Sequence, residues 1–386
     1  MRRASNLKCD FRSLTITSVI PGDFDGDAFM DLLITTKRHD SDNILDVFVN
    51  WGSSDHLNCT EETQPLFKMY GEPLALDYNK DMIIDLFGLN ENQARTFWVF
   101  NDKRETPTAK PMILPKILEN SKLNVPHSHA YLDLNNDFTA DLFITAKDHY
   151  EVWHGLENEG FKYNDTFRTN AVNEKHLGQT LFLDIELTGT VNLIVPICFD
   201  RYCQNSTILV RIGEEFHDLR VNFKDSDNQQ WGFVVPNDNL YTNTITMRGG
   251  DFNMDGYPDL LVTLSKQSGQ PQTFLLENVP CPNACGKLTR KFEIQWKALA
   301  PFANGTVMGA FYDFYQDGIL DVIFVEENRG KYRQVAFRNT LDYDANFVKV
   351  IVLTGLTNTR DPTKLTPLGK KKRTYGIIFH SILFLF

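Results

Sequence analysis

Short apolar runs of four to six residues recur along the chain, bounded by Gly, Asn and Asp. They are rich in Val, Ile, Phe and Leu, and this length and composition favour β-strands over amphipathic helices. The runs come in sets of three, and an acidic segment lies between the first and the second run of each set. Each set therefore predicts a strand, an acidic loop, a second strand, a turn and a third strand, with room for a fourth.

Six acidic segments share nearly one arrangement, D-x-[DN]-x-D-x-x-x-D followed by an apolar residue. Four are complete: DFDGDAFMD (23–31), DYNKDMIID (77–85), DLNNDFTAD (133–141) and DFNMDGYPD (251–259). The sixth, DFYQDGILD (313–321), has Tyr315 at its third position, and the fourth, DIELTGTVN (184–192), keeps only Asp184 and Glu186 as acids. The segments start 51 to 67 residues apart, the size of one β-propeller blade. We predict an all-β propeller over residues 15–345 with six motif-bearing blades.

The spacing of these acids predicts metal ligands. Side chains at alternate positions of a tight loop point to one centre, and position 7 adds a backbone carbonyl. Six to eight hard oxygen ligands are what Ca²⁺ takes. An EF-hand is excluded because it needs Glu at position 12 and flanking helices, whereas apolar strands follow here. No His, Lys or Ser recurs beside the loops, so we expect a structural metal rather than a catalytic one and no enzymatic activity.

The expected ligands follow from the spacing, and the total is about four Ca²⁺ sites with a fifth possible. The first loop offers Asp23, Asp25, Asp27, the Phe29 carbonyl and Asp31; the second offers Asp77, Asn79, Asp81, the Ile83 carbonyl and Asp85; the third offers Asp133, Asn135, Asp137, the Thr139 carbonyl and Asp141; the fifth offers Asp251, Asn253, Asp255, the Tyr257 carbonyl and Asp259. The sixth loop offers a weaker site of Asp313, Asp317 and Asp321, and the fourth loop is expected to hold no metal.

Charge and hydropathy exclude other classes. The net charge is −11, and no basic stripe of the kind that binds nucleic acid is present. No apolar run reaches the 18 residues of a membrane span, and the start is not a signal peptide. Nucleotide-binding and hydrolase motifs are absent. His127 and His129 are either a metal pair or packing residues, and packing is favoured because no third ligand is implied.

Cysteines and sequons agree with an oxidising compartment without establishing one. Two local pairs, Cys198 with Cys203 and Cys281 with Cys285, are expected as disulfides rather than free thiols. The partners of Cys9 and Cys59 stay open. Glycosylation sequons occur at Asn58, Asn164, Asn205 and Asn304, and they permit secretion.

The repeats resemble the FG-GAP repeats of integrin α-chain propellers, in which such loops bind Ca²⁺. Longer strings are similar to the T-cell immunomodulatory protein family, also called integrin-α FG-GAP repeat-containing proteins. These strings are VPHSHAYLDLNNDFTADLFIT (125–145), GDFNMDGYPDLLVTL, FLLENVPC (274–281), FYDFYQDGILDVIFV and FVKVIVLTGL (347–356). The resemblance covers residues 15–368. Integrin propellers have seven blades, so either six blades close here or an open arc exposes two edges.

The resemblance implies an extracellular or cell-surface glycoprotein, anchored in the family by a single type I membrane helix that this chain lacks, which modulates T cells through a protein partner at the cell surface. Around the propeller we expect an N-terminal segment (1–14), the start of the region after the propeller (346–368) and an unstructured or aberrant tail (369–386). Two rival functions remain: an enzyme or lectin that uses the propeller as scaffold, and an adhesion or assembly protein that pairs through an open blade edge.

Overall fold

In the computed structural model, the described residues are 11, 14–37, 43–53, 57, 64–169, 171, 174–235, 245–267, 269–282 and 285–341. They are almost entirely β-strand, turn and loop. The chain divides into two compact units, which meet between Arg168 and Thr169 in the sequence. The described helices are the 3₁₀ turn η1 (Lys116–Leu118) and α1 (Ala300–Ala303), and no helix in this part of the chain has the length and apolar character of a membrane span.

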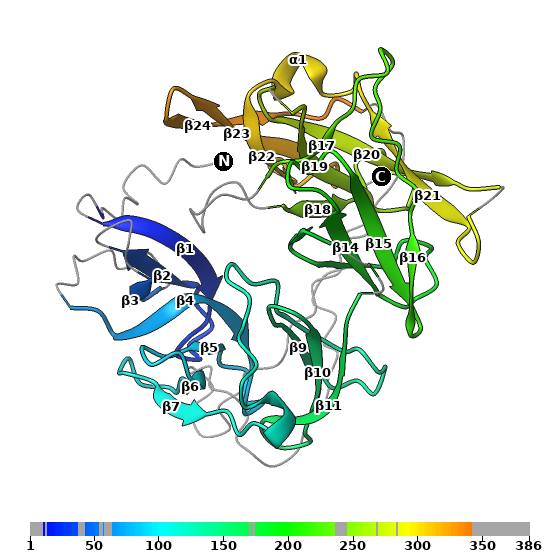
Figure 1. The fold of residues 1–386 in the computed structure, drawn as a ribbon. Coiled ribbons are helices and arrows are strands. Elements are labelled where there is room, and N and C mark those ends of the chain that lie inside the picture. Colours follow the sequence, from blue (N-terminus) through cyan, green and yellow to red (C-terminus); the bar gives the residue numbers. More distant parts are fainter. Residues whose placement is uncertain are drawn as a thin grey trace, which may run out of the picture. The chain divides into compact units, whose positions relative to one another are not determined.

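The first unit contains three antiparallel repeats (Figure 1). Their strands are β1 (Thr15–Gly22), β2 (Asp31–Lys37) and β3 (Ile44–Asn50); β4 (Phe67–Leu76), β5 (Asp85–Leu89), β6 (Arg95–Val99) and β7 (Thr108–Pro111); and β8 (Ala130–Leu132), β9 (Asp141–Thr145), β10 (Tyr150–Gly155) and β11 (Phe161–Phe167). The long strand β4 belongs to two repeats. Its first half pairs with β3 and its second half with β5, with a register shift between Tyr70 and Leu74.

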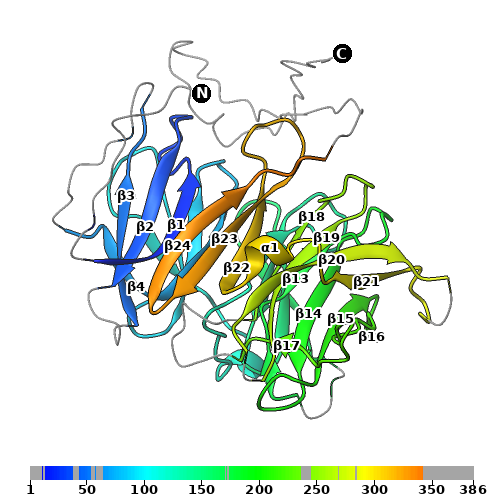
Figure 2. The ribbon, with the colours of Figure 1, turned by 90° about the horizontal axis from the view of Figure 1, so that it is seen from above.

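The second unit contains the other three repeats (Figure 2). Their strands are β12 (His176–Leu177), β13 (Leu181–Leu183), β14 (Asn192–Cys198), β15 (Ser206–Ile212) and β16 (Glu215–Asp218); β17 (Gly232–Phe233), β18 (Met247–Gly250), β19 (Asp259–Ser265), β20 (Gln272–Pro280) and β21 (Arg290–Gln295); and β22 (Thr306–Tyr312), β23 (Asp321–Asn328) and β24 (Lys331–Phe337). In all six repeats an acidic loop joins the first strand to the second, which confirms the predicted strand order.

The sequence pattern did not predict one feature of the fourth and fifth repeats. Two short segments, instead of one strand, pair with the second strand of each of these repeats. β12 and β13 both pair with β14, and β17 and β18 both pair with β19. The first strand is therefore interrupted, and a two-residue pairing is too short to leave a periodic pattern in the sequence.

The second strands of the first five repeats are largely buried on both faces, which explains their continuous apolar runs, whereas β23 of the sixth repeat buries mainly the face that carries Val322 and Phe324. Successive side chains of a strand point to opposite faces. Leu86 of β5 accordingly joins a core with Leu33 and Val47 of the first repeat, whereas Phe87 joins a core with Leu142 and Ile144 of the third. In the second unit, Leu260 and Val262 pack in the core shared with the fourth repeat, and Leu261 packs in the core shared with the sixth. Within each of the two units, consecutive repeats thus pack through the faces of their sheets.

The predicted cysteine pairs and sequons can be placed in part. Disulfides join Cys198 to Cys203 and Cys281 to Cys285. The sequon residues Asn164, Asn205 and Asn304 are exposed. Asn58, Cys9 and Cys59, together with the predicted segments 346–368 and 369–386, lie outside the described residues. Glycosylation and the domain boundaries therefore stay predictions.

Candidate metal centre

One hydrogen-bond network recurs in the first, second, third, fifth and sixth loops. The aspartate at position 1 accepts the N–H of position 5 on Oδ1, at 3.1–3.2 Å, and the N–H of position 6 on Oδ2, at 2.8–3.1 Å. The aspartate at position 5 accepts the N–H of position 7 on Oδ1, at 2.8–3.1 Å. Five separate segments therefore form the same loop, and the spacing of their acids is the reason.

The backbone of these loops is left-handed at two positions. Position 4 has φ between 53° and 72°, and position 6 has φ between 64° and 89°. Glycine occupies only some of these places. Lys80, Asn136, Met254 and Gln316 stand at position 4, and Ala28, Met82 and Phe138 at position 6. A residue other than glycine costs about 1–2 kcal/mol in this region. A strained conformation kept in every copy indicates that the loop shape is required.

The aspartate at position 9 begins the second strand and is buried in all five loops. Asp31, Asp85, Asp141 and Asp259 have no exposed surface, and Asp321 is 2% exposed. Oδ2 accepts the N–H of position 2, at 2.8–3.2 Å, and Oδ1 accepts an N–H close to the end of the third strand, at 2.6–2.9 Å. This carboxylate therefore ties the start of the loop to the far strand, a role that the sequence pattern did not indicate.

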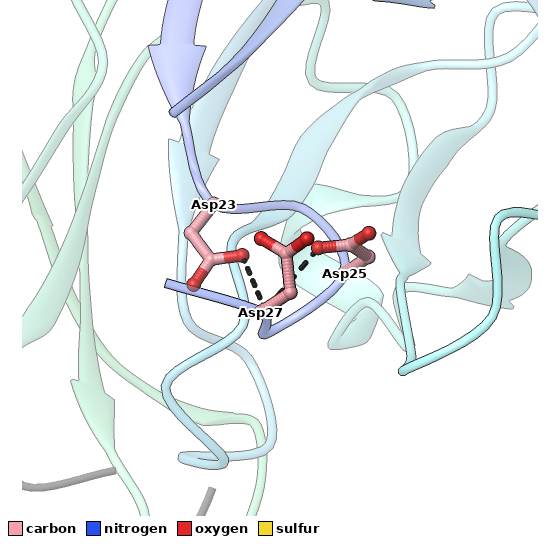
Figure 3. Close-up of side chains that lie close together, drawn as sticks. All are labelled: Asp23, Asp25 and Asp27. Atoms are coloured by element: carbon pink, nitrogen blue, oxygen red, sulfur yellow. Dashed lines mark hydrogen bonds between the residues drawn. The ribbon is translucent and has the colours of Figure 1, made fainter. Parts of the chain in front are cut away.

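Three carboxylates converge in the first loop. One oxygen each of Asp23, Asp25 and Asp27 lies within 4.8 Å of the other two (Figure 3). Ligand oxygens lie about 2.4 Å from Ca²⁺, so two on opposite sides of the ion are about 4.8 Å apart. The donors are all oxygen atoms, as Ca²⁺ prefers. Among the described residues this is the one such group of acids, because the other complete loops carry Asn at position 3.

Burial makes several carboxylates of the acidic loops costly to ionise. Desolvation raises the pKa of Asp31 and Asp259 to about 6 and that of Asp85 to about 7, against hydrogen bonds from backbone N–H groups that lower it. Desolvation also raises the pKa of Asp23, Asp27 and Asp77. A nearby cation favours the ionised form of such groups. The donor set and its electrostatics therefore fit a divalent cation.

Three of the acidic loops, the second, the fourth and the fifth, contact the repeat that follows them. The backbone carbonyl of Tyr78, at position 2 of the second loop, accepts the N–H of Gly160 of the third repeat, at 2.8 Å. The equivalent carbonyl of Ile185 accepts Asn278 Nδ2, at 3.0 Å, and that of Phe252 accepts Asn339 Nδ2, at 3.0 Å. Each of these contacts joins a loop to the following repeat, so a cation in the loop would stabilise the junction between two repeats.

Arginines approach three of the loops, and sequence analysis missed all of them. Arg104 pairs with Asp25 and Asp27. Arg290 lies 3.9 Å from Asp255 and packs over Tyr257, and Arg338 lies 3.3 Å from Asp317 and packs over Tyr315. Arg104 is 79 residues from Asp25 in sequence, whereas Arg338 is 21 residues from Asp317. The separations share no period, so no sequence signal points to these contacts.

The fourth loop keeps the backbone but not the carboxylates. Leu187 and Gly189 are left-handed, and Asp184 accepts the N–H groups of Thr188 and Gly189. Glu186 accepts hydrogen bonds from the N–H and hydroxyl of Thr289, at 2.6 and 2.7 Å. The following repeat therefore supplies donors to this loop directly. The expectation that it holds no metal, like the ligand sets of the other loops, stays a prediction.

A second polar cluster in the first unit contains a serine, a histidine and an aspartate. Ser121 Oγ lies 3.2 Å from His149 Nε2, and His149 Nδ1 lies 2.8 Å from Asp148 Oδ1. Ser121 is not free to act as a nucleophile, however, because its hydroxyl also donates to Glu151 and accepts from Arg95, both at 2.9 Å. We assign the cluster a structural role.

His127 and His129 stack on each other with ring centroids 4.1 Å apart. The N–H of Thr145 donates to His129 Nδ1, at 2.9 Å. Neither histidine belongs to a group of three metal-ligating side chains among the described residues.

Comparisons with known proteins point to one family. No family model matches the chain. The chain is 36% identical to the T-cell immunomodulatory protein of Homo sapiens over 384 residues, which cover 92% of this chain and 60% of that protein. It is also 36% identical to the Mus musculus protein of the same name and 24% identical to "Protein linkin" of Caenorhabditis elegans. The chain thus spans about three fifths of the length of these relatives.

Solved structures are less similar. AofleA of Arthrobotrys oligospora aligns at a TM-score of 0.38 and 11% identity, over 84% of each chain. An α-L-arabinofuranosidase of Fusarium graminearum aligns at a TM-score of 0.41 and 10% identity, over 83% of this chain and 92% of that one. Values below 0.5 do not assign a fold.

Proposed function

We propose that this chain, a homologue of the T-cell immunomodulatory proteins along three fifths of their length, forms a calcium-stabilised β-propeller that binds a protein partner outside the cell. The observation that carries the proposal is the recurrence of one strained, acid-lined loop in five repeats, each with the same hydrogen bonds. Backbone strain and buried carboxylates both cost stability. A bound cation offsets these costs, and ordinary turns have no need of either feature.

The proposed metal is structural. In the first loop Asp23, Asp25, Asp27 and Asp31 would hold it together with the Phe29 carbonyl. The side chains at positions 1, 3, 5 and 9, with the carbonyl at position 7, would do so in the second, third and fifth loops. Bound calcium would supply positive charge to these oxygen ligands. The chain's own residues orient the loop through the backbone N–H groups and anchor it to the next repeat through the contacts at position 2.

The repeated packing supports the propeller. Six successive antiparallel repeats carry the loop between their first and second strands. Within each of the two compact units, the sheets of consecutive repeats pack face to face around shared cores. This is the arrangement by which propeller blades bury both faces. We propose an extracellular location on the resemblance of the repeats to the T-cell immunomodulatory protein family, and the two disulfides and the exposed sequons agree with it.

Thermal unfolding of the full chain, secreted from a eukaryotic host, tests the metal. The melting temperature is measured in EDTA and then with Ca²⁺ returned. A ligand at 100 times its dissociation constant stabilises by about 2.7 kcal/mol per independent site. Asp137→Ala should weaken the response, whereas Asp227→Ala, an exposed acid outside the loops, should not. A folded protein with no response to Ca²⁺ would refute the proposal.

Binding to cells tests the partner. A labelled chain should bind the surface of T cells in Ca²⁺, and brief proteolysis of the cells should abolish binding if the partner is a protein. Binding that survives proteolysis would favour a glycan or lipid partner and contradict the proposed protein-binding role.

A further inference from the structure

We propose that Arg104 is a built-in counterion of the first loop that competes with calcium, so that this loop binds Ca²⁺ more weakly than the third loop. The inference rests on the proposed calcium function, and it concerns a residue that lies outside the acidic motif and in the next repeat.

The guanidinium of Arg104 holds the two carboxylate oxygens that the loop itself leaves available. Arg104 Nε donates to Asp25 Oδ2, at 2.6 Å, and Nη2 donates to Asp27 Oδ2, at 3.0 Å. The other oxygens of these two side chains already accept backbone N–H groups of the loop, at 3.2 and 2.9 Å. A cation that uses Asp25 and Asp27 therefore meets the same Oδ2 atoms as the guanidinium.

The surroundings keep Arg104 at the loop. Nη2 also donates to the carbonyl of Gly52, at 3.2 Å, and the guanidinium carbon lies 5.5 Å from the ring centre of Trp51. Such a cation–π contact adds to the electrostatic attraction of the carboxylates. The Asp25 side chain is 5% exposed, so its interaction with the guanidinium is only weakly screened by water.

The second and third loops satisfy the equivalent oxygen with the neutral side-chain amide of the asparagine at position 3. Asn79 Nδ2 donates to Asp81 Oδ2, at 2.8 Å, and Asn135 Nδ2 donates to Asp137 Oδ2, at 3.0 Å. The third loop has three aspartates and no basic residue of its own, whereas the first has four aspartates, and Arg104 brings the first to the same net charge of −3. The second loop has three aspartates and carries Lys80 within its own sequence.

Calcium binding in the first loop consequently opposes the guanidinium. If both cations stay, they repel each other across shared carboxylates. If the arginine leaves, its hydrogen bonds to both aspartates and to Gly52 are lost. Either course lowers the Ca²⁺ affinity of this loop.

Calcium titration of the full chain, starting from EDTA-treated protein, tests the inference. Trp51 fluorescence reports the first loop. The contribution of Trp51 to the total fluorescence change is the part that disappears in Trp51→Phe. Calorimetry of the same samples reports all sites together. We expect Arg104→Gln to tighten the Trp51-reported binding by about fivefold or more, since removing a competing ion pair is worth about 1 kcal/mol. Arg104→Lys keeps the positive charge but loses the planar guanidinium that donates to both aspartates, so it should increase the Ca²⁺ affinity less than Arg104→Gln does.

Two controls sharpen the result. Arg168→Gln removes the same charge from an exposed pair with Asp148 and should leave the titration unchanged. Adding Asp27→Asn to Arg104→Gln should remove the gain. Unchanged or weaker Trp51-reported binding in Arg104→Gln, with calcium still bound elsewhere, would overturn this inference and leave the proposed function standing. Absence of calcium binding in any loop would instead refute the proposed function.

Discussion

Glu151 accepts two parallel hydrogen bonds from the guanidinium of Arg95, at 2.7 and 2.8 Å, and joins the second repeat to the third. Both side chains are buried. Burial alone would raise the pKa of Glu151, but hydrogen bonds and the charge of Arg95 hold it below the ordinary value. Trp153 Nε1 and Ser121 Oγ also donate to the carboxylate. The contact lies between the faces of two sheets, where either charge alone would be buried without a counterion.

Removal of one partner of this pair should be strongly destabilising. Arg95→Met leaves an ionised carboxylate buried without its counterion, and such changes cost about 3–5 kcal/mol. Urea denaturation at constant Ca²⁺ measures the loss. The double variant Arg95→Met/Glu151→Leu should recover much of it. Arg333→Gln, in an exposed pair with Glu326, should cost less than about 1 kcal/mol. Equal losses in the single and double variants would show that packing, not charge, is responsible.

The buried aspartate at position 9 should matter even without metal. Asp85→Ala leaves the N–H groups of Tyr78 and Phe100 without their acceptor, and an unsatisfied buried donor costs about 1–3 kcal/mol. In EDTA we expect Asp85→Ala to lower the free energy of unfolding clearly more than Asp81→Ala, whose carboxylate is partly exposed. In Ca²⁺ both variants should have a lower free energy of unfolding than the wild type. If Asp85→Ala has no effect in EDTA, the carboxylate serves the metal alone.

Acid should destabilise the fold through His127. Burial lowers the pKa of this imidazole from 6.5 to about 4, so the folded protein holds it neutral. A depressed pKa contributes stability that is present above pH 6.5 and is lost as the pH falls toward 4, because the unfolded chain takes up the proton first. The loss reaches at most about 3 kcal/mol.

The His127 term can be isolated by comparing His127→Gln with the wild type in EDTA. Glu72 and the buried aspartates titrate in the same range with opposite sign, since their pKa values are raised. Those contributions cancel in the difference between the two proteins. The difference in unfolding free energy should shrink as the pH falls from 6.5 to 4. A difference that is constant over this range would show that His127 does not titrate with folding.

Gly155 should be required for the third loop. A Cβ atom at this position would lie 2.3 Å from the carbonyl oxygen of Ala140, at position 8 of the loop, while the Gly155 N–H donates to Asp141. Gly155→Ala should therefore cost about 1–3 kcal/mol and weaken calcium binding in that loop. Gly213→Ala is the control, since a Cβ there meets nothing within 4 Å. Its left-handed backbone gives it a small cost of its own but no effect on calcium.

Much of this protein was determined by local sequence. The apolar runs after the acidic segments form the second strands, such as β5 and β9. Both faces of these two strands are buried, so each strand is a continuous apolar run that can be recognised from its own residues alone. The loops followed from the spacing of Asp77, Asn79 and Asp81, since short-range hydrogen bonds from the backbone to these side chains define the turn. The comparisons found homologues among the T-cell immunomodulatory proteins, to which the same strings had pointed.

The tertiary structure decided what lies across from each loop. Arg104 reaches Asp25 from the next repeat, and Asn278 reaches the carbonyl of Ile185. The interruption of the first strand at β12 and β13 was also invisible in the sequence. These contacts join residues that are dozens of positions apart at no fixed spacing, and they exist only because sheets pack face to face. Periodicity records the environment of a residue along its own strand, whereas the choice of partner depends on which strands the packing brings together.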